Sequence, residues 1–285
     1  MKEQWINNKF EYAVIGDPVA HSLSPEMQNA GFAELGLGRP YGKYHVKVDE
    51  IAAFAEFARE NLRGFNITVP HKKNIIPYLD SISRPAELAE SVNTVTVRDG
   101  KLCGDSTDGF GLAAALYEAF GTEIKGGRFL FIGCGGAVQA VAFYFASIGA
   151  SQLCFANRTV AKAEALAAGI AGNYSCSTQY CSPNDKEQLQ EFVNSSSVLI
   201  QGTSLGLKSD DPIPVDLAVL NSKIAIYDTI YKPTALLRYA AAQGMKFSDG
   251  RKMLLHQGAR SFEIWTGRKA PIDTMRAGLE NAMSC

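Results

Sequence analysis

Residues 129–137, Phe129-Leu-Phe-Ile-Gly133-Cys-Gly135-Gly136-Ala137, form an apolar run that ends in a glycine-rich turn. The run predicts a buried strand, and the apolar segment after it predicts a helix from Ala137 to Ile148. Glycines here allow backbone N–H groups to approach a pyrophosphate, whose charge a helix N-terminus stabilises. The stretch therefore predicts a nucleotide-binding unit, although such turns can also serve only tight helix–strand packing.

The residues after the next predicted strand bear on the choice of nucleotide. That strand, 152–156, ends in Asn157-Arg158-Thr159, and Lys162 follows one turn later. An NAD site usually has an acid here for the ribose hydroxyls, whereas Arg and Lys suit a 2′-phosphate. We therefore expect NADP, against the simpler interpretation of a solvated basic helix start. The third glycine of the usual fingerprint is absent, and Val138 or Ala140 stands near its place.

The alternation of strands and helices continues around this unit. An apolar helix is predicted over 109–120, strand-and-helix segments at 129–149, 152–168, 197–201 and 223–244, and a polar surface helix at 184–193. This alternation predicts an α/β domain with a doubly wound parallel sheet.

The N-terminal part predicts a second α/β domain. Its predicted elements are strands at 11–16, 44–48 and 64–69, a helix capped by Ser24 with Pro25 in its first turn, a helix capped by Asp49, and a hairpin of 93–97 with 101–103. The second helix would bury Ile51, Phe54, Phe57 or Ala58, and Leu62 on one face. The hairpin prediction rests on the turn signal Asp99-Gly100.

Length and composition support two domains in an ordinary globular protein. The chain has 285 residues, 46% hydrophobic and 20% charged, with a formal net charge of -1. This balance argues against a nucleic-acid or membrane-surface protein, and no apolar run reaches membrane-spanning length. The N-terminus has no signal-peptide core, and the six cysteines lack metal-ligand spacing. We expect a cytoplasmic protein with buried, reduced thiols and no metal.

Polar side chains recur at strand ends in the N-terminal part. Ser22 and Ser24 lie near a predicted helix start, where hydroxyls can bind a polyol or a carboxylate. Asn66 and Thr68 alternate onto one face of a strand, and Asn93 and Thr94 head the next strand. Each is also open to a structural interpretation, such as N-capping by Ser24. Their recurrence favours a binding pocket.

Lys72 and Asp108 are the most informative pair in the chain. Each follows a predicted strand and lies beside turn-forming residues, in Gly64-Phe-Asn-Ile-Thr-Val-Pro-His-Lys72 and Gly104-Asp-Ser-Thr-Asp108. Rigid strand ends are where reactive groups can be held in place. An ammonium and a carboxylate can donate a proton and stabilise a developing alkoxide. The alternatives are a solvated lysine beside Lys73 and an N-cap for the helix after Asp108.

These stretches resemble the shikimate dehydrogenase family nearly from end to end. The matching segments are 16–25, 64–72, 91–94, 104–109, 133–137, 157–159, 228–233, 253–257 and 262–267. The resemblance implies two domains with a deep cleft. Residues 1–106 with 251–285 would form the substrate-binding catalytic domain, and 107–250 a Rossmann-like NADP domain, with the last helices returning to the first domain.

The resemblance also implies a reaction and its residues. The reaction is reversible hydride transfer between NADPH and the 3-carbonyl of 3-dehydroshikimate, a step of aromatic amino-acid biosynthesis through chorismate. Lys72 would be the acid–base group and Asp108 its partner. The implied substrate-binding residues are Ser22, Ser24, Asn66, Thr68, Asn93, Tyr231 and Gln257. The implied cofactor-binding residues are Gly133, Gly135, Gly136, Ala137, Asn157, Arg158, Thr159, Lys162, Thr203 and Gly250. A small-molecule substrate is expected, with a monomer or a homodimer.

Several positions depart from the family pattern. Gln28 replaces a usual histidine, Ser106 an asparagine and Cys134 an alanine; Gln201-Gly-Thr-Ser204 replaces an Asn-Ala-Thr-like loop, and the Leu-Leu pair after Pro233 comes about two residues early. These changes leave open a paralogue that acts on quinate or another cyclic hydroxy-acid, or a non-catalytic NADP-binding sensor. Methylenetetrahydrofolate dehydrogenases share the architecture, but the Ser22/Ser24 pair and the Gln257 helix argue against them.

Overall fold

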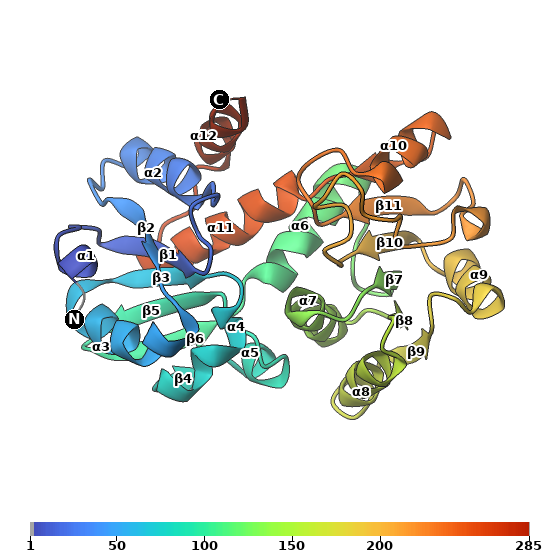
Figure 1. The fold of residues 1–285 in the computed structure, drawn as a ribbon, viewed down its shortest axis with the longest axis horizontal. Coiled ribbons are helices and arrows are strands. Elements are labelled where there is room, and N and C mark those ends of the chain that lie inside the picture. Colours follow the sequence, from blue (N-terminus) through green and yellow to red (C-terminus); the bar gives the residue numbers. More distant parts are fainter. Residues whose placement is uncertain (1–2, 285) are drawn as a thin grey trace. The chain divides into compact units, whose positions relative to one another are not determined.

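The computed structural model describes residues 3–284 and divides the chain into two compact units (Figure 1). Unit 1 comprises Met1–Gly111 and Leu255–Cys285, and unit 2 comprises Leu112–Leu254. The boundaries fall inside two helices, α6 (Asp108–Phe120) and α11 (Arg251–Thr266). The chain therefore leaves unit 1 along α6 and re-enters it along α11.

Unit 2 contains a six-stranded sheet in which all neighbouring strands are parallel. Its strands are β7 (Arg128–Ile132), β8 (Gln152–Ala156), β9 (Ser177–Cys181), β10 (Val198–Gln201), β11 (Ala225–Asp228) and β12 (Phe247–Ser248). Their order, β12-β11-β10-β7-β8-β9, reverses direction between β7 and β10, as in dinucleotide-binding domains. The predicted doubly wound sheet is confirmed. Sequence analysis missed β9, a largely exposed edge strand, and the two-residue β12.

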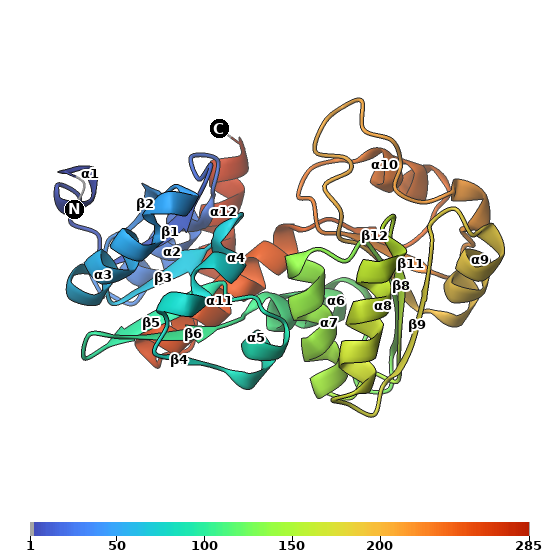
Figure 2. The same ribbon diagram turned by 60° about the horizontal axis from the view of Figure 1, so that its bottom comes forward.

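Helices cover both faces of this sheet (Figures 1 and 2). They are α7 (Gly136–Ser147), α8 (Val160–Ala171), α9 (Lys186–Ser195) and α10 (Ala235–Ala242). Alternate side chains of β7 face the two layers: Phe129 and Phe131 pack against Phe145 of α7, with ring centroids 5.0 and 5.9 Å apart. Leu130 and Ile132 join the opposite core with residues of α9 and α10. Burial on both faces explains why residues 129–132 of β7 are all apolar.

Unit 1 contains a mixed six-stranded sheet in the order β2-β1-β3-β5-β6-β4. Its strands are β1 (Tyr12–Gly16), β2 (Tyr41–His45), β3 (Gly64–Ile67), β4 (Ser81–Ile82), β5 (Thr94–Arg98) and β6 (Lys101–Asp105). The predicted β5–β6 hairpin is confirmed, and both turn residues have positive φ, 51° at Asp99 and 72° at Gly100. Such a turn matches the twist of the two strands.

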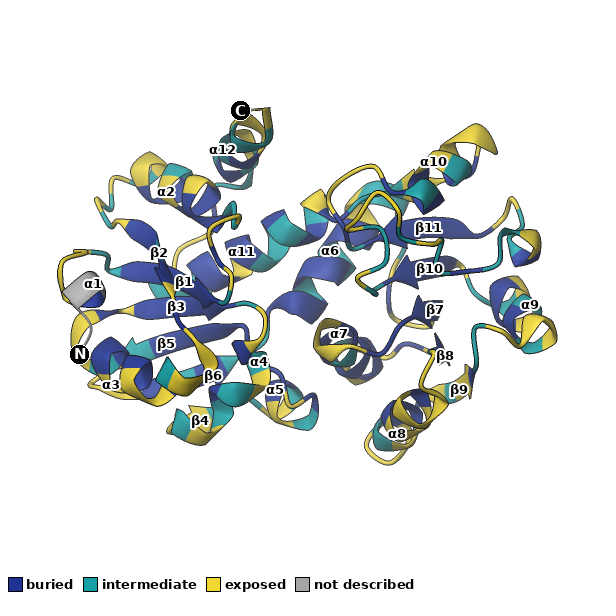
Figure 3. Ribbon diagram, in the orientation of Figure 1, coloured by how far each residue is buried: buried dark blue, intermediate teal, exposed yellow. Residues whose placement is uncertain are grey.

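Helices also pack on both sides of the unit 1 sheet, and its strands β1 and β3 are buried along their whole length (Figure 3). The helices are α1 (Glu3–Ile6), α2 (Ser24–Glu34), α3 (Ile51–Asn61), α4 (His71–Asn74), α5 (Arg84–Leu88) and α12 (Ile272–Ser284). On one side Phe54 of α3 packs against Phe65 of β3. On the other, Tyr12 of β1 packs against Phe32 of α2 and Trp265 of α11. The helix returning from unit 2 thus completes this core.

Two predicted helix caps are wrong. Helix α2 begins at Ser24 itself, and its N-cap is Leu23. No side chain caps this helix, and the hydroxyl of Ser22, two residues earlier, accepts the backbone N–H of Ser24 at 3.3 Å. Asp49 lies inside a short 3-10 turn, and Glu50 is the N-cap of α3.

Two predicted strands have different bounds. β2 begins at Tyr41 and ends at His45, earlier than predicted at both ends. β3 ends at Ile67, and Val69 is 70% exposed instead of continuing the buried face. Pro70, which lacks an N–H for a sheet ladder, follows directly after Val69.

Candidate active site

Lys72 and Asp108 form an ion pair in unit 1, with Lys72 Nζ 2.5 Å from Asp108 Oδ2. Lys72 lies in the single turn of α4 that follows β3, and Asp108 is the first residue of α6, after β6. The carboxylate is only 6% exposed, and the ammonium is 22% exposed. A charge shielded to this degree requires paired partners. The geometry therefore brings the two predicted reactive groups into direct contact.

Asn93 binds the other carboxylate oxygen. Its Nδ2 donates to Asp108 Oδ1 at 2.8 Å and lies 3.4 Å from Gln257 Oε1 on α11. Its Oδ1 accepts the backbone N–H of Thr107 at 2.8 Å, which fixes the orientation of the amide. Four predicted site residues, Lys72, Asp108, Asn93 and Gln257, therefore form one connected group within unit 1.

The two serines before α2 form a second group. Ser22 Oγ lies 3.2 Å from Ser24 Oγ, and Ser22 remains half-buried while Ser24 is buried. Ser24 also lies beside the phenol of Tyr41, whose pKa burial raises well above its usual value. The pair presents hydroxyl groups at the start of α2, which can bind a carboxylate.

Asn66 and Thr68 do not share the environment that alternation predicted. Asn66 is buried and fully engaged: Tyr41 OH donates to its Oδ1 at 2.8 Å, and its Nδ2 lies within 3.1 Å of Thr94 Oγ1 and Ser261 Oγ. A ligand could reach this amide only by displacing one of these partners. Thr68 lies beyond the end of β3 and is half-buried.

Unit 2 has a cavity of about 420 Å³ at the ends of β7, β8 and β10. Among the predicted cofactor residues, those that line it are Gly133, Gly135, Asn157, Arg158, Thr159, Lys162 and Thr203. This is the point where strand order reverses, the usual ligand site of such sheets. Gly136 and Ala137 continue the turn into α7. Gly250 has a packing role, because a Cβ there would lie 2.1 Å from Thr229 O.

The glycines of the turn leave open space. A Cβ built at Gly135 or Gly136 meets nothing within 4 Å, so tight packing does not explain either glycine. Gly133 differs, since its φ is +98° and a Cβ would lie 2.7 Å from Thr203 Cγ2. The missing third glycine has a substitute: a Cβ at Gly202 would lie 2.2 Å from Val138 Cγ2, so the close approach of α7 depends on Gly202.

The charges around this cavity suit a phosphorylated ligand. Arg158 and Lys162 are exposed, and neither forms an ion pair with any residue in the described part of the chain. The lining contains no Asp or Glu. Burial raises the pKa of Cys134 to about 12, so its thiol adds no negative charge. Asn157 joins the two turns, accepting from Cys134 N at 3.1 Å and donating to Thr159 O at 2.8 Å. These residues fit a dinucleotide with a 2′-phosphate.

Two of the residues that depart from the family pattern, Gln201 and Gln28, are buried and hydrogen-bonded to backbone groups. Gln201 is fully buried; it accepts from Thr203 N at 2.6 Å and donates to Leu205 O at 2.9 Å, which holds the loop after β10. Gln28 is also fully buried and donates to Gly258 O on α11 at 2.9 Å. Each glutamine therefore holds a segment that carries predicted site residues.

Other predicted features lie elsewhere. Tyr231 belongs to unit 2 and is 39% exposed. In the segment after Pro233, Thr234 caps α10 by accepting from Leu237 N at 3.2 Å.

The thiols of residues 103, 134, 154, 176 and 181 are free, and all but Cys103 are buried; Cys285 lies outside the described residues. Sequence reasoning missed Thr107 and Ser261, whose buried hydroxyls carry no local signal.

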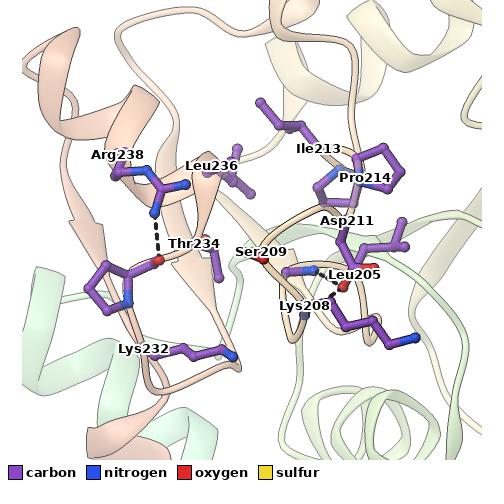
Figure 4. Close-up of a pocket in the computed structure, with 14 residues that line it drawn as sticks. Leu205, Lys208, Ser209, Asp211, Ile213, Pro214, Lys232, Thr234, Leu236 and Arg238 are labelled. Atoms are coloured by element: carbon purple, nitrogen blue, oxygen red, sulfur yellow. Dashed lines mark hydrogen bonds between the residues drawn. The ribbon is translucent and has the colours of Figure 1, made fainter.

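A second cavity of unit 2, about 250 Å³, contains none of the predicted site residues (Figure 4). It lies between residues 205–214 and 232–238. Its polar groups bond to the surrounding loops: Asp211 accepts from Gly206 N and Lys208 N at 2.9 Å, and Arg238 donates to Pro233 O at 2.8 Å. Those two N–H groups hold the pKa of Asp211 below its usual range. The cavity brings no reactive pair together.

Within residues 3–284, no cluster of His, Cys, Asp and Glu could hold a metal ion. In that same range, no helix is both long and apolar enough to cross a bilayer.

Three family models match successive parts of the chain. They are the shikimate dehydrogenase substrate binding domain at residues 14–95, shikimate / quinate 5-dehydrogenase at 115–207, and the shikimate 5'-dehydrogenase C-terminal domain at 250–280. A relative from Thermococcus kodakarensis named shikimate dehydrogenase (NADP(+)) is 40% identical over 275 residues, covering 94% of this chain and 96% of the relative.

Solved structures share the fold. Shikimate 5-dehydrogenase from Listeria monocytogenes, in complex with shikimate and NAD, has a TM-score of 0.88 at 36% identity and covers 94% of this chain and 96% of its own. The ligand-free 5-ketofructose reductase of Gluconobacter sp. strain CHM43 has a TM-score of 0.85 at 31% identity and covers 97% and 99%. The likeness therefore extends over both units.

The open space above the turn generates a prediction. Replacing Gly135 by Ala should leave the thermal unfolding midpoint within about 2 °C of wild type, because the added Cβ meets no protein atom within 4 Å. The same side chain should weaken NADP binding at least about tenfold by occupying the place of the phosphates. Calorimetric titration and a thermal melt of the same sample measure both. A destabilised variant that binds NADP normally would show that the glycine serves packing.

Proposed function

The chain belongs to the shikimate dehydrogenase family, and on this premise we propose that it catalyses the NADP-dependent interconversion of 3-dehydroshikimate and shikimate. The observation that carries the proposal is the shielded Lys72–Asp108 pair, with its carboxylate bonded to Asn93. Bound NADPH supplies the hydride that reduces the ketone carbon. The protein must supply the proton for the ketone oxygen, and a lysine ammonium can do so.

Lys72 acts as the acid–base group in this proposal. In the reducing direction its Nζ gives a proton to the ketone oxygen as the C–O double bond becomes an alcohol, and in the oxidising direction the neutral amine takes that proton back. Asp108 accepts from Lys72 Nζ at 2.5 Å and keeps it at a fixed place. Positioning of this kind, together with charge stabilisation, accounts for most of what a rigid site contributes to rate.

Unit 1 binds the substrate in this proposal. The Ser22 and Ser24 hydroxyls take the carboxylate, while Thr68, Asn93 and Gln257 take the ring hydroxyls. The amide of Asn66 already bonds to Tyr41 and Ser261, so Asn66 holds these neighbouring side chains in place instead of binding the substrate directly. Shikimate is planar at its carboxylate-bearing carbon, whereas quinate carries an extra hydroxyl there. Because an unpaired buried hydroxyl costs about 1–3 kcal/mol, shikimate is the preferred acid.

Unit 2 binds NADP in this proposal. Backbone N–H groups of residues 133–137 take the pyrophosphate at the start of α7. Arg158, assisted by Thr159 and Lys162, pairs with the 2′-phosphate, and Thr203 lies at the nicotinamide end. Gly250 allows the adjoining backbone to pack closely. The enzyme works in the cytoplasm as a monomer or a homodimer.

The first prediction of this proposal concerns Lys72. Changing Lys72 to Ala should lower kcat by about 10²–10⁴-fold and leave KM for shikimate within a few-fold, because proton transfer acts in the transition state. Lys73 is the matched control, since it is exposed and pairs with Glu90 at the surface. Lys73→Ala should keep normal kinetics. Near-normal turnover of the Lys72 variant would refute the assignment.

The second concerns cofactor choice. Replacing Arg158 by Ala should raise the Michaelis constant for NADPH by about one to two decades and leave that for NADH nearly unchanged, because only NADPH carries the 2′-phosphate. Arg128, exposed at the start of β7, is the control. Steady-state kinetics with both cofactors measure the effect. Equal losses with NADPH and NADH would remove Arg158 from the 2′-phosphate site.

A further inference from the structure

Ser261 lies on α11, one turn after Gln257, and none of the roles above uses it. Its side chain is fully buried. Its hydroxyl oxygen lies 2.8 Å from Thr94 Oγ1, 3.0 Å from Asn66 Nδ2, 3.1 Å from Gln257 O and 3.3 Å from Thr107 Oγ1. One hydroxyl therefore joins polar groups from β3, β5, α11 and the segment before α6.

Groups that can only donate or only accept fix the direction of these hydrogen bonds. The N–H of Thr107 must donate, and it faces Asn93 Oδ1 at 2.8 Å, so Asn93 Nδ2 is the atom that meets Asp108. The backbone oxygen of Asn93 must accept, and Asn66 Nδ2 lies 3.1 Å from it. Both amides are therefore oriented by the main chain.

Thr94 links the two amides. Its Oγ1 lies 3.0 Å from Asn93 Oδ1, so Thr94 uses its single hydrogen there. The 2.8 Å contact between Ser261 and Thr94 is then a hydrogen bond only if Ser261 donates. Asn66 Nδ2 donates to Ser261 at 3.0 Å. Gln257 O, at 3.1 Å, can also accept from Ser261, but the contact with Thr94 is shorter and takes the single hydrogen of Ser261. With this assignment, hydrogen bonds run in one direction, from Asn66 through Ser261 and the side chains of residues 94 and 93, to the carboxylate of Asp108.

We propose that Ser261 is a positioning residue for the acid–base pair, acting through Thr94 and Asn93 to hold an amide N–H on Asp108. The inference rests on the proposed function, because the position of the pair matters to the rate only if the pair transfers a proton. Aligned hydrogen bonds polarise one another, so a break at Ser261 weakens the bond at the far end. Without that hydroxyl, Thr94 loses the closer of its two donors and keeps only Asn66 Nδ2 at 3.1 Å, so Asn93 loses part of its restraint.

The test is a double-mutant cycle on Ser261→Ala and Thr94→Val, which remove the two hydroxyls with little change of volume. Each single variant should lower kcat with shikimate and NADP about fivefold to tenfold and leave both KM values within about twofold. The double variant should resemble either single variant, because both changes break the same chain. Losses that multiply in the double variant would overturn the inference.

Two further variants separate positioning from stability. Thr94→Ser keeps the hydroxyl and should recover most of the turnover that Thr94→Val loses, an arm that works even if Ser261→Ala fails to fold. Thr266→Val removes another hydroxyl of α11. Its Oγ1 donates to Phe262 O at 2.7 Å and takes no part in the hydrogen bonds that lead to Asp108. It should lower the unfolding midpoint and keep kcat.

Different results would contradict the role of Ser261 and the proposed function of the protein. Normal turnover by Ser261→Ala, or an equal loss of kcat in Thr266→Val, would overturn this inference alone. No turnover of shikimate by the unaltered enzyme would overturn the proposed function as well.

Discussion

The ion pair of Lys72 and Asp108 lies at the centre of a connected group of buried polar residues in unit 1. A carboxylate that is only 6% exposed gives up most of its hydration, so protein groups must replace it. The ammonium provides one partner and the Asn93 amide another. Asn93 is in turn oriented by Thr107 N and linked through Thr94 to α11. The re-entry of the chain into unit 1 thus completes the surroundings of the pair.

Unit 2 differs from unit 1, because its described residues leave open space and unpaired positive charge at its cavity. Gly135 and Gly136 face open space at the point where the parallel sheet reverses its order, and the cations of Arg158 and Lys162 have no acidic partner in the described chain. Unpaired cations beside a helix N-terminus favour an anionic ligand. The two units therefore divide the chemistry: one holds a matched pair of charges, and the other leaves positive charge unmatched.

Sequence reasoning succeeded where the signal is local. The apolar strand and glycine turn at 129–137, and the positive-φ turn at Asp99-Gly100, each follow from neighbouring residues. It failed at the start of α2, where Ser24 is the first residue of the helix and Leu23 is the N-cap. Ser261 could not be predicted, because a serine on an amphipathic helix shows no partner until α11 packs beside β3 and β5.

The central claim is that this chain oxidises shikimate with NADP. The most direct test follows the absorbance of the reduced nicotinamide with purified protein, comparing shikimate with quinate and NADP with NAD. The account predicts turnover with shikimate and NADP, with kcat/KM at least about tenfold above that for quinate, which corresponds to about 1.4 kcal/mol. Failure to oxidise shikimate, or an efficiency for quinate that equals or exceeds that for shikimate, would contradict it.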